Sequence, residues 1–450
     1  MMHLSLREIT QITGGRMSGP DVACIGVCID SRRIQGGCLF AALEGARVDG
    51  HEFAAEAVQS GSAAVIGSRQ VDGVESQIVV DDVITALGVL ARAWRRSLDV
   101  TVVVVTGSNG KTTVKEMLAS ILRQNHRVLA TVGNFNNELG VPLTLLRLSA
   151  DYRYAVIELG ASKPGDIRYL ADMTNPDIGI VNNAAAAHLQ GFGSTEGVAR
   201  GKGELFESLG KNDIAVINGD QEWTEMWREQ AAASICLQFG LEANNDVHGS
   251  IHDDGSLHIV TPHNEIVLRL PLAGEHNAMN ALAAATAAIS LGIPAAAIRD
   301  GLETVKPVPG RLNRVQAAGG WTIIDDTYNA NPASLYAGLQ VLCGDTGETW
   351  LVLGDMAELG PGSRKLHAEM GEAAAALGIR RLFCTGRLTE STVRSFGSGG
   401  AHFKTRNALV SRLLEELHPS VTCLVKGSRS MGMEEVVDAL VVASVNREAV

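Results

Sequence analysis

The stretch TVVVVTGSNGKTT, residues 101–113, has the residue types and the spacing that bind nucleotide phosphates. Its valine run predicts a buried strand, its glycines predict a tight turn, and the residues from Lys111 onward predict a helix. Backbone N–H groups of such a turn converge on phosphate oxygens at the positive end of the helix. We therefore expect Lys111 to neutralise the β- and γ-phosphates and the Thr112 hydroxyl to coordinate Mg²⁺.

The predicted phosphate loop is shorter than the usual one, because Val105 stands where the usual pattern has its first glycine. An accidental glycine turn is the alternative, but strand, Gly-Lys-Thr and helix follow one another in the expected order. The residues expected to hold the nucleotide here are Gly107, Ser108, Asn109, Gly110, Lys111, Thr112 and Thr113.

Three further polar residues follow predicted strands or lie in the next helix. Glu158 ends the strand YAVIEL, and carboxyl ends of parallel strands meet at a nucleotide crevice, so its carboxylate could hold Mg²⁺. A solvated strand end is the alternative for Glu158. His188 follows the strand IGIVNN, and Lys202 lies in ARGKGELF. Taken alone, this histidine and this lysine are more often ordinary structural residues.

Composition limits the function classes that fit. The chain has 450 residues, which predicts two or three domains, and its 46% hydrophobic and 20% charged residues are ordinary for a folded protein. A net charge of −12 without a basic block argues against nucleic-acid or anionic-lipid binding. We expect no signal peptide and no membrane span. Seven scattered cysteines indicate a reduced, cytoplasmic protein.

The order of elements predicts an α/β protein with three domains. Residues 1–98 alternate short strands with turns and end in a helix at 83–96, which predicts a small N-terminal α/β domain. Residues 99–308 predict a parallel sheet with the phosphate loop and a small antiparallel excursion at 246–270. Residues 309–450 follow the hinge-like KPVPGRLN and predict a Rossmann-like, doubly wound domain.

Several nucleotide-binding classes fit poorly. A GTPase would need Asn-Lys-x-Asp to read guanine, and no such tetrapeptide occurs. A transport ATPase or helicase usually has an apolar run that ends in Asp-Glu, whereas the run here ends in Glu158-Leu159. A dehydrogenase needs a glycine fingerprint without Gly-Lys-Thr.

Taken together, the motifs resemble those of the Mur ligase family along the whole chain. In the first domain the resemblance is carried by DSRRIQGGCLFAALEGARVDGHEF, residues 30–53. In the second it is carried by TGSNGKTT, GNFNNELGVP, ELGAS, NAAAAHLQGFGS, GKGELF and GEHNAMNALAA. In the third it is carried by PGRLN, DDTYNANPAS, VLGDMAELG and KGSRSMGME. Within the family, YNANP and the last two motifs are typical of ligases that add D-alanyl-D-alanine.

The resemblance implies an amide ligase that uses ATP and two Mg²⁺ ions to join D-alanyl-D-alanine to UDP-N-acetylmuramoyl-tripeptide, a step of peptidoglycan synthesis. The tripeptide carboxylate would form an acyl phosphate, which the dipeptide amine would then attack. We expect a cytoplasmic monomer with small-molecule substrates, no nucleic-acid partner and no membrane insertion.

The resemblance also implies roles for residues outside the phosphate loop. The first domain would hold the UDP part of the substrate with Ser31, Arg32, Asp49, Gly50 and His51. The loop at 133–140 would meet its sugar-phosphate end with Asn134, Asn136 and Asn137. The adenine side of ATP would be held by His276, Asn277 and Asn280, with Arg311 and Asp326 joining after domain closure. The incoming dipeptide would meet Asn329, Asn331, Lys426, Ser428 and Arg429. Ion pairing with Asp30, turn formation, helix capping and solvated charges are the alternative roles of these residue types.

In the same way, His188 corresponds to a ligand of a second Mg²⁺, and Lys202 to a lysine that CO₂ carbamylates into an anionic, metal-facing group. Carbamylation needs a neutral amine, so the site should lower the pKa of this lysine by burial or nearby positive charge. The implied metal ligands are Thr112, Glu158, His188 and Lys202. The implied catalytic set is Lys111, Glu158, His188, Lys202 and Arg311.

Two rival functions remain. A sister ligase, such as folylpolyglutamate synthetase or the ligase that adds the third amino acid, shares the phosphate loop, Glu158 and Lys202 but lacks VLGDMAELG together with YNANP. A nucleotide-gated regulatory protein would bind ATP and change shape without forming an amide bond.

Overall fold

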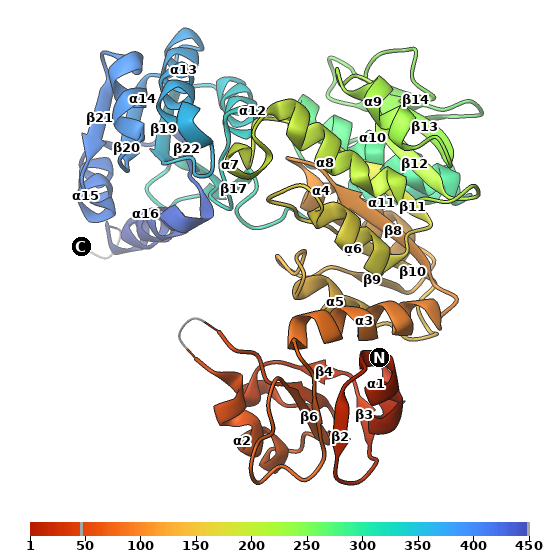
Figure 1. Cartoon of the computed structure of the whole chain (residues 1–450). Coiled ribbons are helices and arrows are strands. Elements are labelled where there is room, and N and C mark those ends of the chain that lie inside the picture. Colours follow the sequence, from red (N-terminus) through yellow and green to blue (C-terminus); the bar gives the residue numbers. More distant parts are fainter. Residues whose placement is uncertain (46–47, 448–450) are drawn as a thin grey trace.

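The computed structural model describes residues 1–45 and 48–447, and its helices and strands form an α/β protein (Figure 1). Within these residues the strands form a two-stranded, a five-stranded, a nine-stranded and a six-stranded sheet. The nine-stranded sheet lies between the smaller N-terminal sheets and the six-stranded sheet (Figure 1). The predicted α/β class is therefore confirmed. Residues 46–47 of the first quoted motif and 448–450 of the third predicted domain lie outside the described residues.

The N-terminal unit contains two small sheets. Strands β1 (His3–Ser5) and β3 (Ala23–Ile25) pair antiparallel, and the five-stranded sheet has the order β2-β7-β6-β5-β4. The bounds of these five strands are Arg16–Ser18 (β2), Val27–Cys28 (β4), Leu39–Ala41 (β5), Ala64–Gly67 (β6) and Gln77–Val79 (β7). The helical segments are α1 (Leu6–Thr13), η1 (Ser31–Arg33), η2 (Gly50–Phe53), α2 (Ala54–Gln59) and α3 (Val83–Arg96).

The central sheet has the order β16-β15-β14-β13-β12-β11-β8-β10-β9. Its strands are β8 (Thr101–Thr106), β9 (Val128–Ala130), β10 (Tyr154–Glu158), β11 (Ile178–Val181), β12 (Ile214–Asn218), β13 (Ile235–Gly240), β14 (Val247–Ile251), β15 (Leu257–Val260) and β16 (Glu265–Leu268). Strands β14, β15 and β16 pair antiparallel, but β14 runs parallel to β13. The antiparallel excursion predicted at 246–270 is thus an extension of the central sheet.

Both faces of the central sheet are covered by helices. Val102 and Val104 of β8 pack into a core with α3, α5, α6 and α8, whereas Val103 and Val105 pack into a second core with α4, α10 and α11. This alternation explains why the valine run has no polar position. The helices are α4 (Lys111–Arg123), α5 (Gly140–Leu145), α6 (Asp166–Thr174), α7 (Leu189–Phe192), α8 (Thr195–Glu207), α9 (Thr224–Gln230), α10 (Glu275–Ser290) and α11 (Ala295–Glu303).

The C-terminal sheet has the order β17-β18-β22-β19-β20-β21, and β17 is its antiparallel edge strand. Its strands are β17 (Asn313–Gln316), β18 (Thr322–Asp326), β19 (Glu348–Gly354), β20 (Arg381–Thr385), β21 (Gly400–Phe403) and β22 (Val421–Lys426). The helical segments are α12 (Pro332–Cys343), η3 (Gly360–Gly362), α13 (Ser363–Ala376), α14 (Thr389–Phe396), α15 (Arg406–Glu416), η4 (Arg429–Met431) and α16 (Glu434–Arg447). Across residues 1–45 and 48–447, no helix has both the length and the apolarity of a membrane span.

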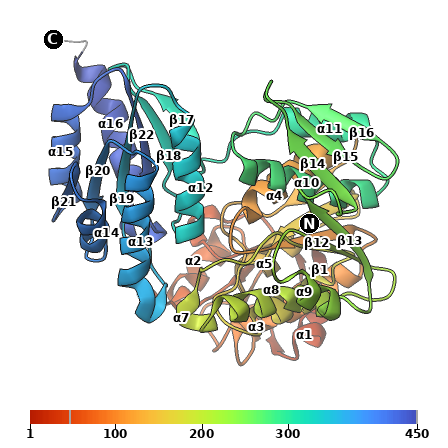
Figure 2. The same cartoon turned by 90° about the horizontal axis from the view of Figure 1, so that it is seen from above.

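One extended segment, residues 304–312, connects α11 of the central unit to β17 of the C-terminal unit (Figure 2). The helix α12 faces the central unit across this connection (Figure 2). The segment coincides with the predicted hinge and contains Arg311, so the connection itself forms part of the cleft described below.

A buried arginine joins α3 to the central unit. Arg95 donates from Nε to the Thr174 carbonyl at 3.1 Å, and from its NH2 nitrogen to the Asn175 carbonyl at 3.1 Å and to the Asp177 carboxylate at 2.9 Å. Asp177 also accepts a 2.7 Å hydrogen bond from the Val102 N–H at the start of β8. This arginine therefore fixes α3 against the strand that leads to the phosphate loop.

We predict that Arg95→Ala lowers the free energy of unfolding by about 1–3 kcal/mol, because buried carbonyl acceptors lose their donor. Thermal and denaturant unfolding measure this change. The neighbouring Arg96→Ala is the matched control, since Arg96 is exposed and makes a single long 3.4 Å contact to the Asn175 side chain. Equal losses for the two variants would contradict the prediction.

Candidate active site

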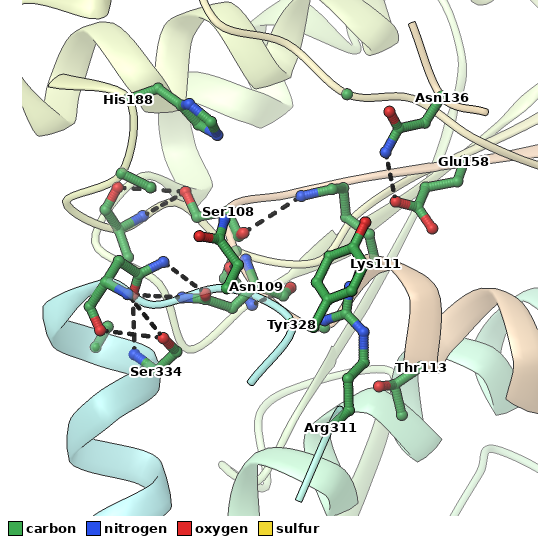
Figure 3. A pocket seen from close by; sticks show the side chains of 18 of the residues that line it. Ser108, Asn109, Lys111, Thr113, Asn136, Glu158, His188, Arg311, Tyr328 and Ser334 are labelled. Atoms are coloured by element: carbon green, nitrogen blue, oxygen red, sulfur yellow. Dashed lines mark hydrogen bonds between the residues drawn. The ribbon is translucent and has the colours of Figure 1, made fainter. Parts of the chain in front are cut away.

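A cleft of about 1390 Å³ lies where the central and C-terminal units face each other. Its walls come from the phosphate loop, the carboxyl ends of β10 and β11, the start of α10 and the start of α12 (Figure 3). Ile84 and Thr85 of α3 extend it toward the N-terminal unit. The predicted site residues that line it are Ser108, Asn109, Gly110, Lys111, Thr113, Asn136, Asn137, Glu158, His188, His276, Asn277, Asn280, Arg311, Asp326, Asn329, Asn331, Lys426, Ser428 and Arg429.

The phosphate loop joins β8 to α4 in few residues. Val105 is fully buried inside β8, so the turn begins only after Thr106, in line with the shortened loop read from the sequence. Gly110 immediately precedes α4 and has a φ of 78°, a left-handed conformation that glycine adopts without steric cost. The helix N-terminus therefore opens directly onto the cleft.

Lys111 folds back over its own loop. Its Nζ donates to the Gly107 carbonyl at 2.7 Å and to the Ser108 carbonyl at 3.3 Å. Burial is the main effect that lowers the pKa of Lys111; the nearby Arg311 lowers it further, whereas Glu158 opposes the shift. A phosphate in the loop would supply a negatively charged partner for this half-buried ammonium.

Amide side chains from neighbouring elements hold the backbone of the loop. The Asn109 N–H donates to Asn183 Oδ1 at 2.8 Å, and the Asn109 carbonyl accepts from Asn182 Nδ2 at 3.0 Å and Asn183 Nδ2 at 3.1 Å. Asn182 Nδ2 also donates to Asn280 Oδ1 of α10 at 2.8 Å. Strand β11 and helix α10 thereby fix the loop from two sides.

A second hydrogen-bonded chain runs through Thr112 and Glu158. The Thr112 hydroxyl donates to Glu158 Oε2 at 2.8 Å, and Asn136 Nδ2 donates to Glu158 Oε1 at 2.8 Å. Arg311 donates to the Thr112 hydroxyl at 2.9 Å, and its guanidinium lies 4.2 Å from the ring centroid of Tyr328. Figure 3 shows Asn136 and Glu158 facing each other, with Tyr328 and Arg311 lower in the view. A hydroxyl and a carboxylate are oxygen donors of the kind that Mg²⁺ binds.

Lys202 is buried on α8 with 1% of its surface exposed, and its Nζ lies 5.7 Å from the ring centroid of Phe192. In the described part of the chain, its ammonium has no hydrogen bond or ion pair. Burial, followed by the charge of Lys111, lowers the pKa of Lys202 to about 7. An appreciable fraction of this amine is therefore neutral at neutral pH, as carbamylation requires.

His188 lies at the start of α7 with a φ of 54°, and its Nδ1 lies against the carboxylate of Glu358 from the C-terminal unit. The Gln190 N–H also donates to the Glu358 carbonyl at 3.3 Å. Burial is the largest effect on the pKa of His188 and lowers it, while Glu358 opposes the shift. This histidine therefore joins the two walls of the cleft.

The C-terminal wall carries a buried cation. Lys426 Nζ donates to Asp326 Oδ2 and to the Asn329 carbonyl, the latter at 2.9 Å. The Ser428 hydroxyl accepts from the Ala357 N–H at 2.7 Å. Arg429 is more exposed and forms a 3.0 Å ion pair with Glu434.

The start of α10 forms the remaining wall. Burial, followed by the charge of Lys426, lowers the pKa of His276 to about 4, so its imidazole is neutral at neutral pH. Asn277 Nδ2 donates to the Ala273 carbonyl at 2.8 Å, and its Oδ1 accepts from Asn280 at 3.2 Å. These amides are engaged with the protein as well as facing the cleft.

The residues predicted to hold the UDP part lie on the N-terminal unit, away from the residues that line the cleft. Arg32 is 84% exposed and pairs with Asp30 at 2.9 Å, which is the alternative noted from the sequence. Asp49 bonds to His51 Nδ1 at 2.6 Å and to Arg69 at 2.6 Å, and it begins the turn that contains Gly50. Ser31 begins the short turn η1, and Asn134 is exposed outside the cleft lining.

Among the contacts described above, those of Asn182, Asn183, Tyr328 and Glu358 involve residues that were not predicted from the sequence. The two asparagines end the strand segment IGIVNN, so their position at a sheet edge was a usable signal. Tyr328 belongs to YNANP and Glu358 to MAELG, two motifs already quoted, but their contacts with other elements could not be read from spacing.

Known proteins are similar in sequence to this chain along most of its length. Family models match residues 25–95 (Mur ligase family, catalytic domain), 105–288 (Mur ligase middle domain) and 310–429 (Mur ligase, glutamate ligase domain). The UDP-N-acetylmuramoyl-tripeptide–D-alanyl-D-alanine ligase of Escherichia coli K12 is 44% identical over 449 residues, covering 98% of this chain and 99% of the relative. The chain belongs to the Mur ligase family.

Solved structures resemble this Mur ligase to different degrees, as their TM-scores show. MurF from Acinetobacter baumannii superposes with a TM-score of 0.92 at 34% identity, covering 98% of this chain and 99% of that one. MurF from Thermotoga maritima in complex with ADP has a TM-score of 0.83 at 28% identity, covering 94% and 98%. A ligase named for adding 2,6-diaminopimelate reaches a TM-score of 0.54 at 20% identity, covering 98% and 99%, and shares the fold alone.

We predict that Gly110→Ala weakens ADP binding by tenfold or more, because an added Cβ would lie about 2.2 Å from Asn280 Oδ1 and 2.5 Å from Asn182 Nδ2. Calorimetric titration with ADP measures the affinity. Gly73→Ala is the matched control, since Gly73 has a φ of 80° but open space around its Cβ position. Both variants carry the left-handed backbone cost of about 1–2 kcal/mol, so unchanged ADP affinity in Gly110→Ala would contradict the steric argument.

Proposed function

We propose that this Mur ligase uses ATP to join D-alanyl-D-alanine to UDP-N-acetylmuramoyl-tripeptide, forming the pentapeptide precursor of peptidoglycan. The observation that carries the proposal is that the phosphate loop, Glu158 and residues of YNANP and VLGDMAELG face one cleft. The identity with the Escherichia coli ligase along nearly the whole chain supports the same assignment.

The first step activates a carboxylate that is otherwise a poor acyl donor. One carboxylate oxygen of the tripeptide attacks the γ-phosphorus of ATP, the bond to the bridging oxygen breaks, and ADP leaves. Phosphoryl transfer depends on positioning and on neutralising charge, which we assign to Lys111 and Arg311. Both cations are half-buried beside the loop, where their electrostatic effect on phosphate is stronger than in water.

The donor set fits the implied Mg²⁺ ions. The Thr112 hydroxyl and the Glu158 carboxylate would hold the ion bound to the phosphates, and His188 with a carbamate on Lys202 would hold a second ion. When bound, the ions neutralise phosphate charge. The buried Lys202 amine, which has no anionic hydrogen-bond partner among the described residues, is the feature that favours carbamylation.

The second step forms the amide bond. The amine nitrogen of D-alanyl-D-alanine attacks the carbonyl carbon, and phosphate leaves. We assign the C-terminal wall with Lys426, Ser428, Arg429 and Asn329 to this substrate, because a fixed cation suits its free carboxylate. The acyl phosphate reacts readily with water, so closure of the C-terminal domain over the cleft would protect it.

The same proposal gives each domain its own ligand. Residues 1–98 would bind the UDP end with Ser31, Arg32, Asp49, Gly50 and His51, residues 99–308 would bind ATP, and residues 309–450 would bring the dipeptide. We propose that the protein acts as a monomer in the cytoplasm.

We predict that phosphate release from Mg-ATP requires both UDP-N-acetylmuramoyl-tripeptide and D-alanyl-D-alanine, and that the product has the mass of the UDP-linked pentapeptide. A phosphate-release assay with parallel mass spectrometry measures both. Replacing the dipeptide by D-alanine alone is the control. Phosphate release that ignores both peptide substrates, with no new amide, would overturn the proposal in favour of a nucleotide-gated regulator.

We also predict that ligase activity of CO₂-depleted enzyme is restored by bicarbonate and that the restored activity falls as pH drops below about 7. The reason is that the Lys202 amine, with a pKa of about 7, becomes protonated and unreactive toward CO₂ as pH falls. Lys202→Arg should lose at least about 100-fold in kcat and ignore bicarbonate. NMR with isotope-labelled bicarbonate should show one labelled lysine.

Lys115 provides an internal control for this labelling. It is as buried as Lys202, at 1% exposed, but its Nζ donates to the Thr131 carbonyl at 2.7 Å. Labelling that persists in Lys202→Arg would place the carbamate elsewhere and contradict the assignment.

A further inference from the structure

The side chain of Asn109 is the part of the phosphate loop that reaches the C-terminal domain. Asn331 Nδ2 donates to Asn109 Oδ1 at 2.8 Å, and Asn109 Nδ2 approaches Asn331 Oδ1 at 3.5 Å. Figure 3 shows Asn109 between the phosphate loop and the start of α12. The two residues are 222 positions apart in the chain, so this contact exists only when the two domains meet.

Each partner is also held by hydrogen bonds within its own domain. The backbone of Asn109 is held on both its N–H and its carbonyl by Asn182 and Asn183. Asn331 is the N-cap of α12, and its Oδ1 accepts from the Ser334 N–H at 2.9 Å. This capping bond orients the amide so that its Nδ2 faces Asn109. Asn331 is also buried, at 8% exposed, which strengthens the contact by excluding water.

Two other side-chain contacts between these walls involve groups with assigned roles toward ATP and metal. Arg311 donates to the Thr112 hydroxyl, and Glu358 lies against His188. A metal ion bound to Thr112 or His188 would compete with Arg311 or Glu358 for that side chain. The Asn109 amide has no such competitor, since a phosphate loop binds phosphate mainly through backbone N–H groups.

We infer that the Asn109–Asn331 amide pair positions the phosphate loop for ATP and couples nucleotide binding to closure of the C-terminal domain. Asn331 then acts on the loop, and not on the dipeptide. The closed domain holds Asn109, and with it the loop, in one shape; a nucleotide that requires this shape favours the closed domain in return. The inference rests on the proposed function where KM values are measured, but the ADP affinity can be measured with the nucleotide alone.

The test uses the full chain with Asn109→Ala, Asn331→Ser and the double variant. Serine is as good an N-cap as asparagine, so Asn331→Ser keeps α12 capped while its shorter side chain no longer reaches Asn109. Each single variant should weaken ADP binding and raise KM for ATP by about three- to tenfold, the loss of one hydrogen bond in a buried site. KM for D-alanyl-D-alanine should stay within twofold of wild type.

Non-additivity is the decisive readout. If the residues act through one contact, the double variant should bind ADP no more weakly than either single variant. Small-angle X-ray scattering with saturating ADP should also show a larger radius of gyration in the variants than in the wild type. Ser334→Ala, which removes the reciprocal hydrogen bond to the Asn331 N–H without touching Asn109, is the control for the helix cap and should leave ADP affinity unchanged.

Additive losses, unchanged ADP affinity, or a rise in KM for the dipeptide in Asn331→Ser alone would each overturn the inference. A rise in KM for the dipeptide would instead show that Asn331 acts in the dipeptide site. ADP affinity and scattering require no peptide substrate. If the wild-type chain had no ligase activity, the proposed function would be wrong, but these two measurements would still test the inference.

Discussion

The phosphate loop can exist in this cleft only because other elements satisfy its buried backbone. Lys111 pairs the Gly107 and Ser108 carbonyls from within the loop, but the backbone of Asn109 needs partners from outside, since unpaired buried polar groups are costly. Here Asn183 accepts from the Asn109 N–H, while Asn182 and Asn183 donate to its carbonyl. The loop therefore depends on the asparagines that follow β11 and, through the Asn182–Asn280 hydrogen bond, on α10.

Lysines in and beside the cleft carry the proposed chemistry, although the whole chain has a net charge of −12. Lys426 is neutralised by Asp326, and Lys111 is hydrogen-bonded to carbonyls of its own loop. Lys202 has no such hydrogen-bond partner in the described residues, and burial lowers its pKa. We therefore assign the three lysines different roles: Lys426 to a substrate carboxylate, Lys111 to phosphate, and Lys202 to reaction as a neutral amine.

The two walls of the cleft belong to different sheets, and single side chains join them. Arg311 reaches Thr112 from the connecting segment, Asn331 reaches Asn109 from the N-cap of α12, and Glu358 reaches His188 from the loop between β19 and η3. Each contact joins a residue beside the phosphate loop to a residue of the C-terminal unit. Movement of that unit would therefore change the geometry of the nucleotide site directly.

The sequence by itself determined the α/β class, the phosphate loop and the family, because these depend on local patterns. A β-branched run, a glycine turn and a helix pattern are set by nearby residues, and motif order along the chain identifies the Mur ligases. The position of Glu158 at the cleft was also readable, since carboxyl ends of parallel strands share one edge.

Only the tertiary structure decided which of the polar residues meet. Sequence spacing could not show that Asn109 faces Asn331 or that His188 faces Glu358, because these partners come from different sheets. Nor could it show that the environment of Lys202 lowers its pKa, whereas Lys115, equally buried, has a carbonyl partner. Such differences depend on burial and on long-range neighbours, which exist only after the chain has folded and the central and C-terminal units have met at the cleft.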